Sequence, residues 1–120
     1  MKYDKNNIFA KILRGEIPCK KIFENKYALS FYDSSPQKKI HALIIPKGEY
    51  TDLDHFNMKA SEKEIVEFYK SITHVVKLLK ISNNETGYRL ISNVGLDGGQ
   101  EIRHFHHHIL GGEKIGKMVT

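Results

Sequence analysis

Apolar residues recur between positions 65 and 79 at the spacing of one helix face. Ser61 and Glu64 precede them as a capping box, so the pattern predicts a helix of about five turns. A shorter helix is predicted between Asn7, a typical N-cap, and Gly15, a typical C-terminal stop. The apolar positions of the long helix are Ile65, Phe68, Ile72, Val75, Val76 and Leu79, and those of the short helix are Ile8, Phe9, Ile12 and Leu13.

Five short stretches have the composition of β-strands, at residues 21–24, 27–32, 40–46, 88–93 and 104–110. The first two flank an Asn25-Lys26 turn and predict a hairpin. Residues 48–59 form a polar connection with room for one helical turn. The order of elements predicts the α+β class, with an antiparallel five-stranded sheet, one long helix and one short helix.

Four of the seven histidines lie within residues 104–108. On a strand, His104, His106 and His108 would leave one face, with successive rings roughly 6.5 Å apart. His107 would leave the other face, towards the long helix.

Three alternating imidazoles are compatible with three interpretations: a zinc site, an imidazole nucleophile with supporting histidines, or a cluster without function. Gly95, Gly98 and Gly99 come directly before them and allow positive φ and close approach of backbone amides to an anion. Gln100 can donate to a phosphoryl oxygen. This order favours nucleophilic catalysis at phosphorus, because the nearest carboxylate, Glu101, would project from the opposite face of a regular strand and so would not support a zinc-bound histidine.

Composition narrows the function classes further. A chain of 120 residues is expected to form a single domain over residues 1–120, and its charge of +5 is scattered rather than clustered with aromatic residues. This pattern argues against nucleic-acid binding and is compatible with an anionic small molecule. We find no apolar stretch long enough for a membrane and no signal peptide, and the single Cys19 favours a reducing compartment, so we expect a cytoplasmic protein.

The histidine stretch, residues 104–110, resembles the signature of the histidine-triad (HIT) family, in which three histidines alternate with apolar residues. Further segments resemble the Hint branch of that family, and together they span about residues 7–112. These segments are residues 7–12, 15–18, 31–33 and 41–47, followed by Asn93 and residues 98–100.

The resemblance implies a homodimer whose two sheets join edge to edge, and a hydrolase acting on purine nucleoside phosphoramidates and acyl adenylates. His106 would attack the α-phosphorus, and the nucleotidyl-histidine would then be hydrolysed to an AMP-type monophosphate. His108 would contact the phosphate and assist the leaving group, supported by His104 and His41. The resemblance assigns phosphate binding to Asn93, Gln100 and the backbone around Glu101, ribose binding to Asp33, and the base pocket to Ile8, Phe9, Ile12, Ile17, Phe31 and Ser34.

Three features depart from the family pattern. His107 replaces an apolar residue and is expected to be a structural histidine with a hydrogen-bond partner. Asn7 and Ala10 stand where some relatives have the cysteines of a structural zinc site, so we expect no metal and no cofactor. The tail lacks the Trp-Pro-Pro ending of some Hint proteins, so the resemblance does not predict the specificity for the leaving group. Dinucleoside polyphosphate hydrolysis, nucleotide binding with incidental hydrolysis, and a zinc enzyme built on the three histidines remain as alternatives.

Overall fold

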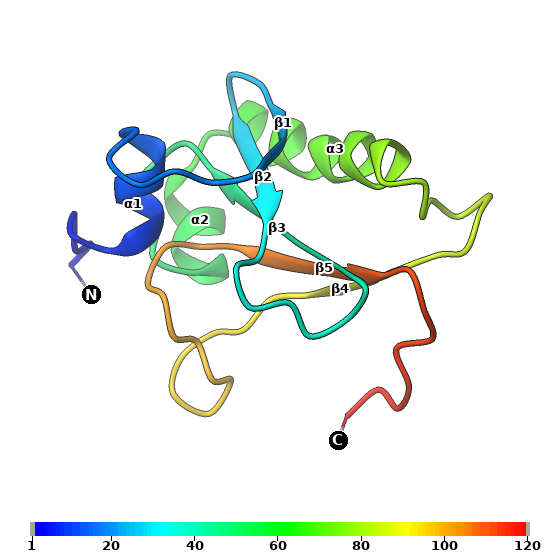
Figure 1. Cartoon of the computed structure of the whole chain (residues 1–120). Coiled ribbons are helices and arrows are strands. Elements are labelled where there is room, and N and C mark those ends of the chain that lie inside the picture. The colour runs from blue at the N-terminus through cyan, green and yellow to red at the C-terminus, as the bar shows by residue number, and fades with distance from the viewer. Residues whose placement is uncertain (1, 120) are drawn as a thin grey trace.

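A computed structural model describes residues 2–119, which form five strands and three helices (Figure 1). In chain order they are α1 (Ile8–Leu13), β1 (Lys21–Glu24), β2 (Ala28–Tyr32), β3 (Ile40–Pro46), α2 (Leu53–Lys59), α3 (Glu62–Leu78), β4 (Arg89–Ile91) and β5 (His107–Gly111). None of these helices is long and apolar enough to cross a membrane.

All five strands belong to one antiparallel sheet in the order β1-β2-β3-β5-β4. The expected β1–β2 hairpin is present, and the Asn25 side chain accepts from the amides of Tyr27 and Ala28 at its turn. β3 lies in the centre and places Leu43 opposite His108 of β5. β5 lies between β3 and β4, and β4 is an edge strand.

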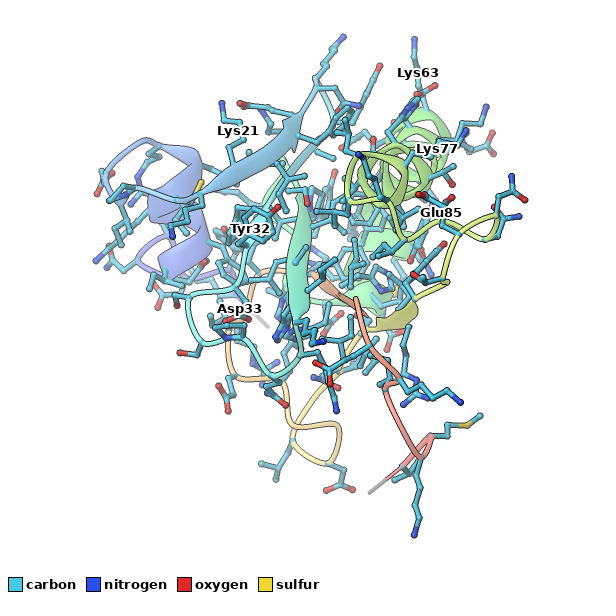
Figure 2. All side chains as sticks on the ribbon, turned by 45° about the vertical axis from the view of Figure 1, so that its right-hand side comes forward. Lys21, Tyr32, Asp33, Lys63, Lys77 and Glu85 are labelled. Carbon is cyan, nitrogen blue, oxygen red and sulfur yellow. The ribbon has the colours of Figure 1, made fainter. Side chains whose placement is uncertain are left out.

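The two faces of the sheet carry different side chains. One face packs against α2 and α3, where the main core includes Phe56, Phe68 and Phe105. The other face packs against α1 through a smaller cluster that includes Phe9, Phe31 and Leu43. Figure 1 shows α3 along one side of the sheet and α1 near the opposite end. The lysines of α3 labelled in Figure 2 project on the side of the molecule away from Asp33.

The helix ends follow the sequence signals. Asn7 accepts from the Ala10 amide at the start of α1, and Gly15, just past its end, has a φ of +77°. Both hydrogen bonds of the capping box between Ser61 and Glu64 are present at the start of α3. These local predictions are confirmed because each cap depends only on residues three or four positions apart.

Three boundaries differ from the sequence prediction. Residues 53–59 form a full helix, α2, where we expected at most one turn, because Asp52 caps it and Phe56 is completely buried in the main core. β5 begins at His107 rather than at His104, and β4 covers only residues 89–91. The ends of the expected domain, Met1 and Thr120, lie outside the described residues.

Candidate active site

Three histidines meet on the sheet face that also carries α1. His41 comes from β3, His108 from β5, and His106 from the extended segment just before β5. The ring centroids of His106 and His108 lie 5.1 Å apart, as do those of His41 and His108. The pairing of β3 with β5 therefore brings together residues that are 67 positions apart in the chain.

The tautomer of His106 follows from one contact. Its Nδ1 lies 2.7 Å from the carbonyl oxygen of His104, and only a protonated nitrogen can donate to a carbonyl. Nε2 therefore keeps its lone pair. The residue is 6% exposed, and Phe9 packs edge-on against its ring at 5.1 Å. The arrangement gives a neutral imidazole with one free, nucleophilic nitrogen.

His104 has a different environment, because both of its ring nitrogens are engaged inside the protein. Nε2 lies 2.9 Å from the Pro46 carbonyl oxygen, and Nδ1 lies 2.6 Å from the hydroxyl of Tyr3. The residue is fully buried. His104 therefore offers no free nitrogen to a metal ion, so the zinc site considered on the three alternating histidines lacks one of its ligands.

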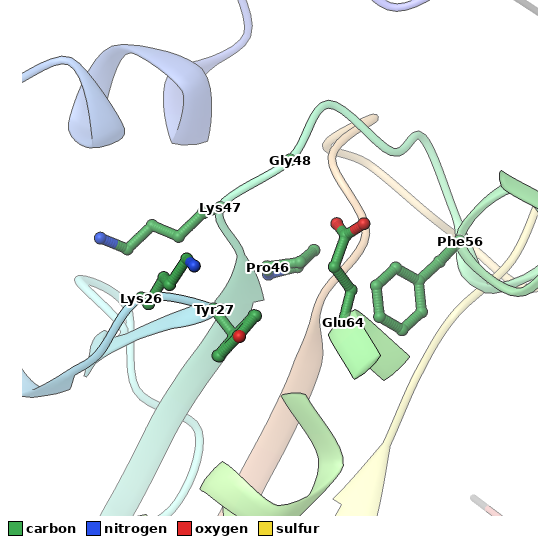
Figure 3. Close-up of a pocket in the computed structure, with 7 residues that line it drawn as sticks. All are labelled: Lys26, Tyr27, Pro46, Lys47, Gly48, Phe56 and Glu64. Carbon is green, nitrogen blue, oxygen red and sulfur yellow. The ribbon is translucent and has the colours of Figure 1, made fainter. Parts of the chain in front are cut away.

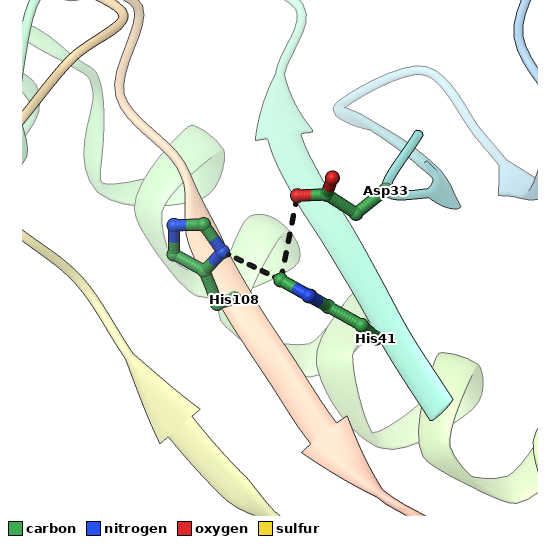
Figure 4. A group of neighbouring side chains, drawn as sticks. All are labelled: Asp33, His41 and His108. Atoms are coloured by element: carbon green, nitrogen blue, oxygen red, sulfur yellow. Dashed lines mark hydrogen bonds and ion pairs between the residues drawn. The ribbon is translucent and has the colours of Figure 1, made fainter. Parts of the chain in front are cut away.

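His41 and His108 form a directed pair (Figure 4). The Gln37 amide donates to Nδ1 of His41, so the proton of the neutral His41 ring is on Nε2. That Nε2 lies 2.9 Å from Nδ1 of His108 and 3.4 Å from a carboxylate oxygen of Asp33. Nδ1 of His108 therefore accepts, and its Nε2–H is left to donate.

Asp33, His41 and His108 could also hold a metal ion, since their ligating atoms lie within 4.8 Å of one another. A metal on Nε2 of His41 would require Nδ1 to carry the proton or the ring to lose both protons. The Gln37 amide points at Nδ1 and disfavours the first arrangement. The group suits proton transfer better than metal binding.

Burial keeps these imidazoles neutral at physiological pH. It lowers the pKa of His104 to about 4. Burial, together with repulsion by His106 and His41, lowers the pKa of His108 to about 4. The pKa values of His106 and His41 also lie below the ordinary histidine value, mainly because of burial, against the opposing effects of the His104 carbonyl and of Asp33 respectively.

The glycine-rich loop after β4 adopts the conformations expected of it. Gly95 and Gly99 have φ values of +69° and +75°, and a Cβ on Gly98 would lie 2.3 Å from the carbonyl oxygen of Val94. The amide of Gly99 bonds to Leu96 and that of Gln100 to Gly95, both within the loop. These two amides hold the loop together as a tight turn. They are therefore not free to donate to a bound anion.

Of the residues predicted to bind phosphate, some have free hydrogen-bond donors and others already donate within the protein. The side-chain amide of Gln100 donates to the carbonyls of Thr51 and Ile102, so its donors tie the loop to the segment before α2. Asn93 is half-buried next to β4, and Glu101 is exposed. The amide of Glu101 has no acceptor among residues 2–119.

The residues predicted for ribose and base fall into two groups. Phe9 and Phe31 are buried and contact each other edge-on at 5.7 Å, with Ile12 packed beside them in the smaller cluster. Ile8 is 46% exposed, Ile17 is half-buried, and Ser34 is exposed next to Asp33. Phe9 and Phe31 therefore form the base of the site on this face. Ile8, Ile17 and Ser34 are accessible to a ligand.

His107 faces α3 as predicted. Its Nε2 lies 3.1 Å from the hydroxyl of Tyr69, and its ring stacks on Phe68. Its Nδ1 is buried without a hydrogen-bond partner among the described residues. The prediction of a structural histidine with a partner is therefore only half right, since one of the two nitrogens is left unpaired.

Two cavities lie elsewhere. One, of about 180 Å³, lies at the end of β3 between Lys26, Tyr27, Lys47 and Glu64 (Figure 3). The other, of about 370 Å³, lies between the segment that enters β4 and residues 113–116. Neither is lined by one of the histidines discussed above, so the candidate site rests on the geometry of His41, His106 and His108.

Sequence reasoning missed the groups that fix the histidine tautomers. They are the Tyr3 hydroxyl, the Gln37 amide, and the carbonyls of Pro46 and His104. Backbone groups carry no sequence signal. Tyr3 lies 101 positions from its partner, and no local pattern connects the two.

A family model described as the HIT domain matches residues 14–115 of this chain. The chain belongs to the HIT family. A 13.2 kDa HIT-like protein of Azospirillum brasilense is 47% identical over 118 residues, which are 98% of this chain and 95% of that protein. A HIT-like protein of Helicobacter pylori is 48% identical over 108 residues, covering 90% of this chain and 98% of that protein.

Solved HIT structures share the fold. A HIT family hydrolase from Clostridium thermocellum matches with a TM-score of 0.86 at 31% identity, covering 98% of this chain and 99% of that one. A HIT family hydrolase from Legionella pneumophila matches with a TM-score of 0.83 at 36% identity, covering 92% and 96%. The predicted family and antiparallel five-stranded sheet are confirmed, with one helix more than predicted.

Proposed function

We propose that this HIT protein is a hydrolase that cleaves purine nucleoside phosphoramidates, and also acyl adenylates, to the nucleoside monophosphate. The observation that carries the proposal is the contact between Nδ1–H of His106 and the His104 carbonyl, which leaves Nε2 of His106 unprotonated beside the partly exposed His108. The naming of the Clostridium and Legionella relatives as HIT family hydrolases supports hydrolysis in general.

In the first step, Nε2 of His106 forms a bond to the α-phosphorus while the P–N bond breaks. The His106 ring becomes positively charged as it attacks, and the His104 carbonyl next to Nδ1–H stabilises that charge. The departing amine takes up a proton. That proton comes from Nε2–H of His108, which is held in this tautomer because its Nδ1 accepts from Nε2–H of His41 at 2.9 Å. In the second step the attacking water returns a proton to Nε2 of His108.

In the second step, water attacks the nucleotidyl-histidine, the P–N bond to His106 breaks, and the monophosphate is released. Two displacements replace one difficult step by two easier ones. Phosphate oxygens would be bound by Asn93, Gln100 and the Glu101 amide. Gln100 would give up one of its hydrogen bonds to a backbone carbonyl in order to donate to the phosphate. The uncommitted lone pairs of Asp33 would accept from the ribose hydroxyls, and the purine would lie against Ile8, Phe9, Ile12, Ile17, Phe31 and Ser34.

The test is turnover of adenosine 5′-phosphoramidate by the wild-type protein and by His106→Asn. We expect His106→Asn to lose activity by a factor of about 10³ or more, with unchanged circular dichroism and thermal midpoint. His74→Asn is the matched control, because His74 is exposed on α3 and stacks on Phe23, away from the other histidines. An adduct of AMP on His106 in acid-quenched reactions would support the covalent step directly.

The same assay separates the alternatives. Faster cleavage of dinucleoside polyphosphates than of phosphoramidates would change the substrate class but not the residues. Binding of AMP without turnover of either substrate would make this a nucleotide-binding protein. Full activity of His106→Asn would exclude His106 as the nucleophile, and stoichiometric zinc in protein purified without an affinity tag would favour the metalloenzyme.

The proposed assembly is a homodimer, in the cytoplasm. β4 is an edge strand, and Tyr88 and Leu90 at that edge are each 38% exposed. An unpaired edge with apolar side chains is suited to pairing with a second copy. Leu90→Lys should shift the protein from dimer to monomer in sedimentation, and a monomeric wild-type protein would refute this assembly.

A further inference from the structure

The segment that precedes α1 reaches the buried side of the histidine cluster. Its Tyr3 hydroxyl lies 2.6 Å from Nδ1 of His104, and the two rings pack edge to face with centroids 5.6 Å apart. Phe9 of α1 packs edge-on against both His104 and His106, at 6.4 and 5.1 Å. The N-terminal residues are therefore part of the wall behind the proposed nucleophile.

The Tyr3 contact has a defined direction. Nε2 of His104 faces the Pro46 carbonyl at 2.9 Å and must carry a proton to donate to it. Nδ1 of the neutral ring is then an acceptor, and the Tyr3 hydroxyl is its donor. Because His104 is fully buried, no water can replace that hydroxyl without a change in packing.

The orientation of His104 matters for His106. β5 begins only at His107, so the peptide that carries the His104 carbonyl lies outside the regular ladder of the sheet; the Phe105 amide of the same peptide donates to the Tyr50 carbonyl at 2.7 Å. The same carbonyl accepts from Nδ1–H of His106 and fixes which nitrogen of that ring carries the proton. A His104 ring held at both nitrogens acts together with the bond from the Phe105 amide to Tyr50 to keep this carbonyl in place.

We propose that Tyr3 is a positioning residue of the active site: its hydroxyl fixes the His104 ring, and the His104 carbonyl then holds His106 with Nε2 free to attack. The proposal rests on the proposed function for its kinetic consequence. Its structural consequence, a single tautomer of His106, does not depend on any substrate.

The decisive variant is Tyr3→Phe, which keeps the aromatic ring and removes only the hydroxyl. We expect kcat on adenosine 5′-phosphoramidate to fall by between about 10-fold and 100-fold, because His106 would no longer be held in one tautomer by a fixed carbonyl. KM should change little, because Tyr3 lies behind the histidines. In ¹⁵N-labelled protein, the imidazole signals of His106 should change from those of one tautomer to those of a mixture.

Tyr69→Phe is the matched control. Tyr69 also places its hydroxyl on a histidine, Nε2 of His107, but on the opposite face of the sheet. It should leave kcat and the His106 imidazole signals unchanged. Equal thermal midpoints for Tyr3→Phe and Tyr69→Phe would show that the kinetic difference does not come from stability.

The outcomes distinguish this proposal from the proposed function. Unchanged His106 signals in Tyr3→Phe overturn the positioning role, whatever the activity. If the wild-type protein hydrolyses none of the substrates, the proposed function fails, and a mixed tautomer in Tyr3→Phe still supports the positioning role. If kcat falls while His106 keeps a single tautomer, Tyr3 acts by another route and the proposal is wrong.

Discussion

Nε2 of His41 lies 2.9 Å from Nδ1 of His108, and the Gln37 amide fixes the direction of the hydrogen bond between them. His41 therefore donates, and His108 presents Nε2–H to the open face. The pair depends on the antiparallel register that places His41 and His108 on adjacent strands. His41, which is buried, thus determines that His108 carries its proton on Nε2.

Replacing His41 should therefore damage catalysis without removing a substrate contact. We expect His41→Leu to lower kcat by between about 10-fold and 100-fold, because His108 would no longer be held in one tautomer. His41→Gln should recover part of the loss, since its amide can donate to the same nitrogen. Steady-state kinetics of the two variants test this, and equal activity in both would contradict the proton-direction argument.

Asp33 has a position that suits ribose recognition. One carboxylate oxygen accepts from the Ser35 amide at 2.7 Å, and the other lies 3.4 Å from His41. Loss of a hydrogen bond to a charged group costs about 1.5–3 kcal/mol. Asp33→Asn should therefore weaken AMP binding by roughly 10-fold to 100-fold, measured by calorimetry. The affinity for 2′,3′-dideoxy-AMP should not change; if it falls equally, Asp33 does not recognise the ribose hydroxyls.

The pH dependence of kcat/KM should reflect a nucleophile that stays neutral in mild acid. Burial holds the pKa of His106 below the ordinary value of about 6.5. A lowered pKa means that the reactive neutral form persists to lower pH. The acid limb of the profile should therefore have its midpoint below pH 6.5. A midpoint above pH 7 would mean that a different group, or a protonated His106, controls the reaction.

Much of the fold could be predicted because its signals are local. The apolar stripe and capping box of α3, the Asn25 turn and the alternating apolar residues of the strands each involve residues a few positions apart. α2 was predicted as at most one helical turn, because only Leu53, Phe56 and Met58 among its seven residues are apolar. Its signal was the N-cap Asp52, and burial of Phe56 by the sheet and α3 supplies the rest of its stability.

The site was predicted less completely for a different reason. Alternation correctly separated His106 and His108 from His107, since period two depends only on the extended backbone. The proton positions depend on the carbonyls of Pro46 and His104 and the amide of Gln37, and every residue has such groups. Gln100 is predicted to bind phosphate, and its hydrogen bond to the Thr51 carbonyl could not be predicted because Thr51 is close only in the folded chain.

Gly98 allows the loop before the histidines to close on itself. A Cβ at this position would meet the Val94 carbonyl oxygen at 2.3 Å, so Gly98→Ala must open the turn. We expect at least about a 10-fold loss of kcat/KM with little change in the thermal midpoint, because the loop is largely exposed. Leu96→Ala is the control in the same loop, since Leu96 is 93% exposed. Equal kinetics for the two variants would argue against a role for loop shape.

His107 should make the protein less stable in acid. Burial and the neighbouring His106 and His108 lower its pKa to about 4, whereas in the unfolded chain it is about 6.5. Between these values the unfolded state binds more protons, so the free energy of unfolding falls as the pH falls from 6.5 towards 4. Each such histidine contributes a slope of up to about 1.4 kcal/mol per pH unit.

His107→Leu removes this contribution together with the buried, unpaired Nδ1. Tyr69 loses its partner, but it is half-buried and water can replace the imidazole. The variant should therefore gain stability relative to the wild type at pH 5 compared with pH 8, measured by urea unfolding at one protein concentration. His74→Leu, which removes an exposed histidine of α3, is the control for the loss of one imidazole. A His107→Leu effect of the same size at both pH values would mean that His107 takes up its proton equally in the folded and unfolded chains.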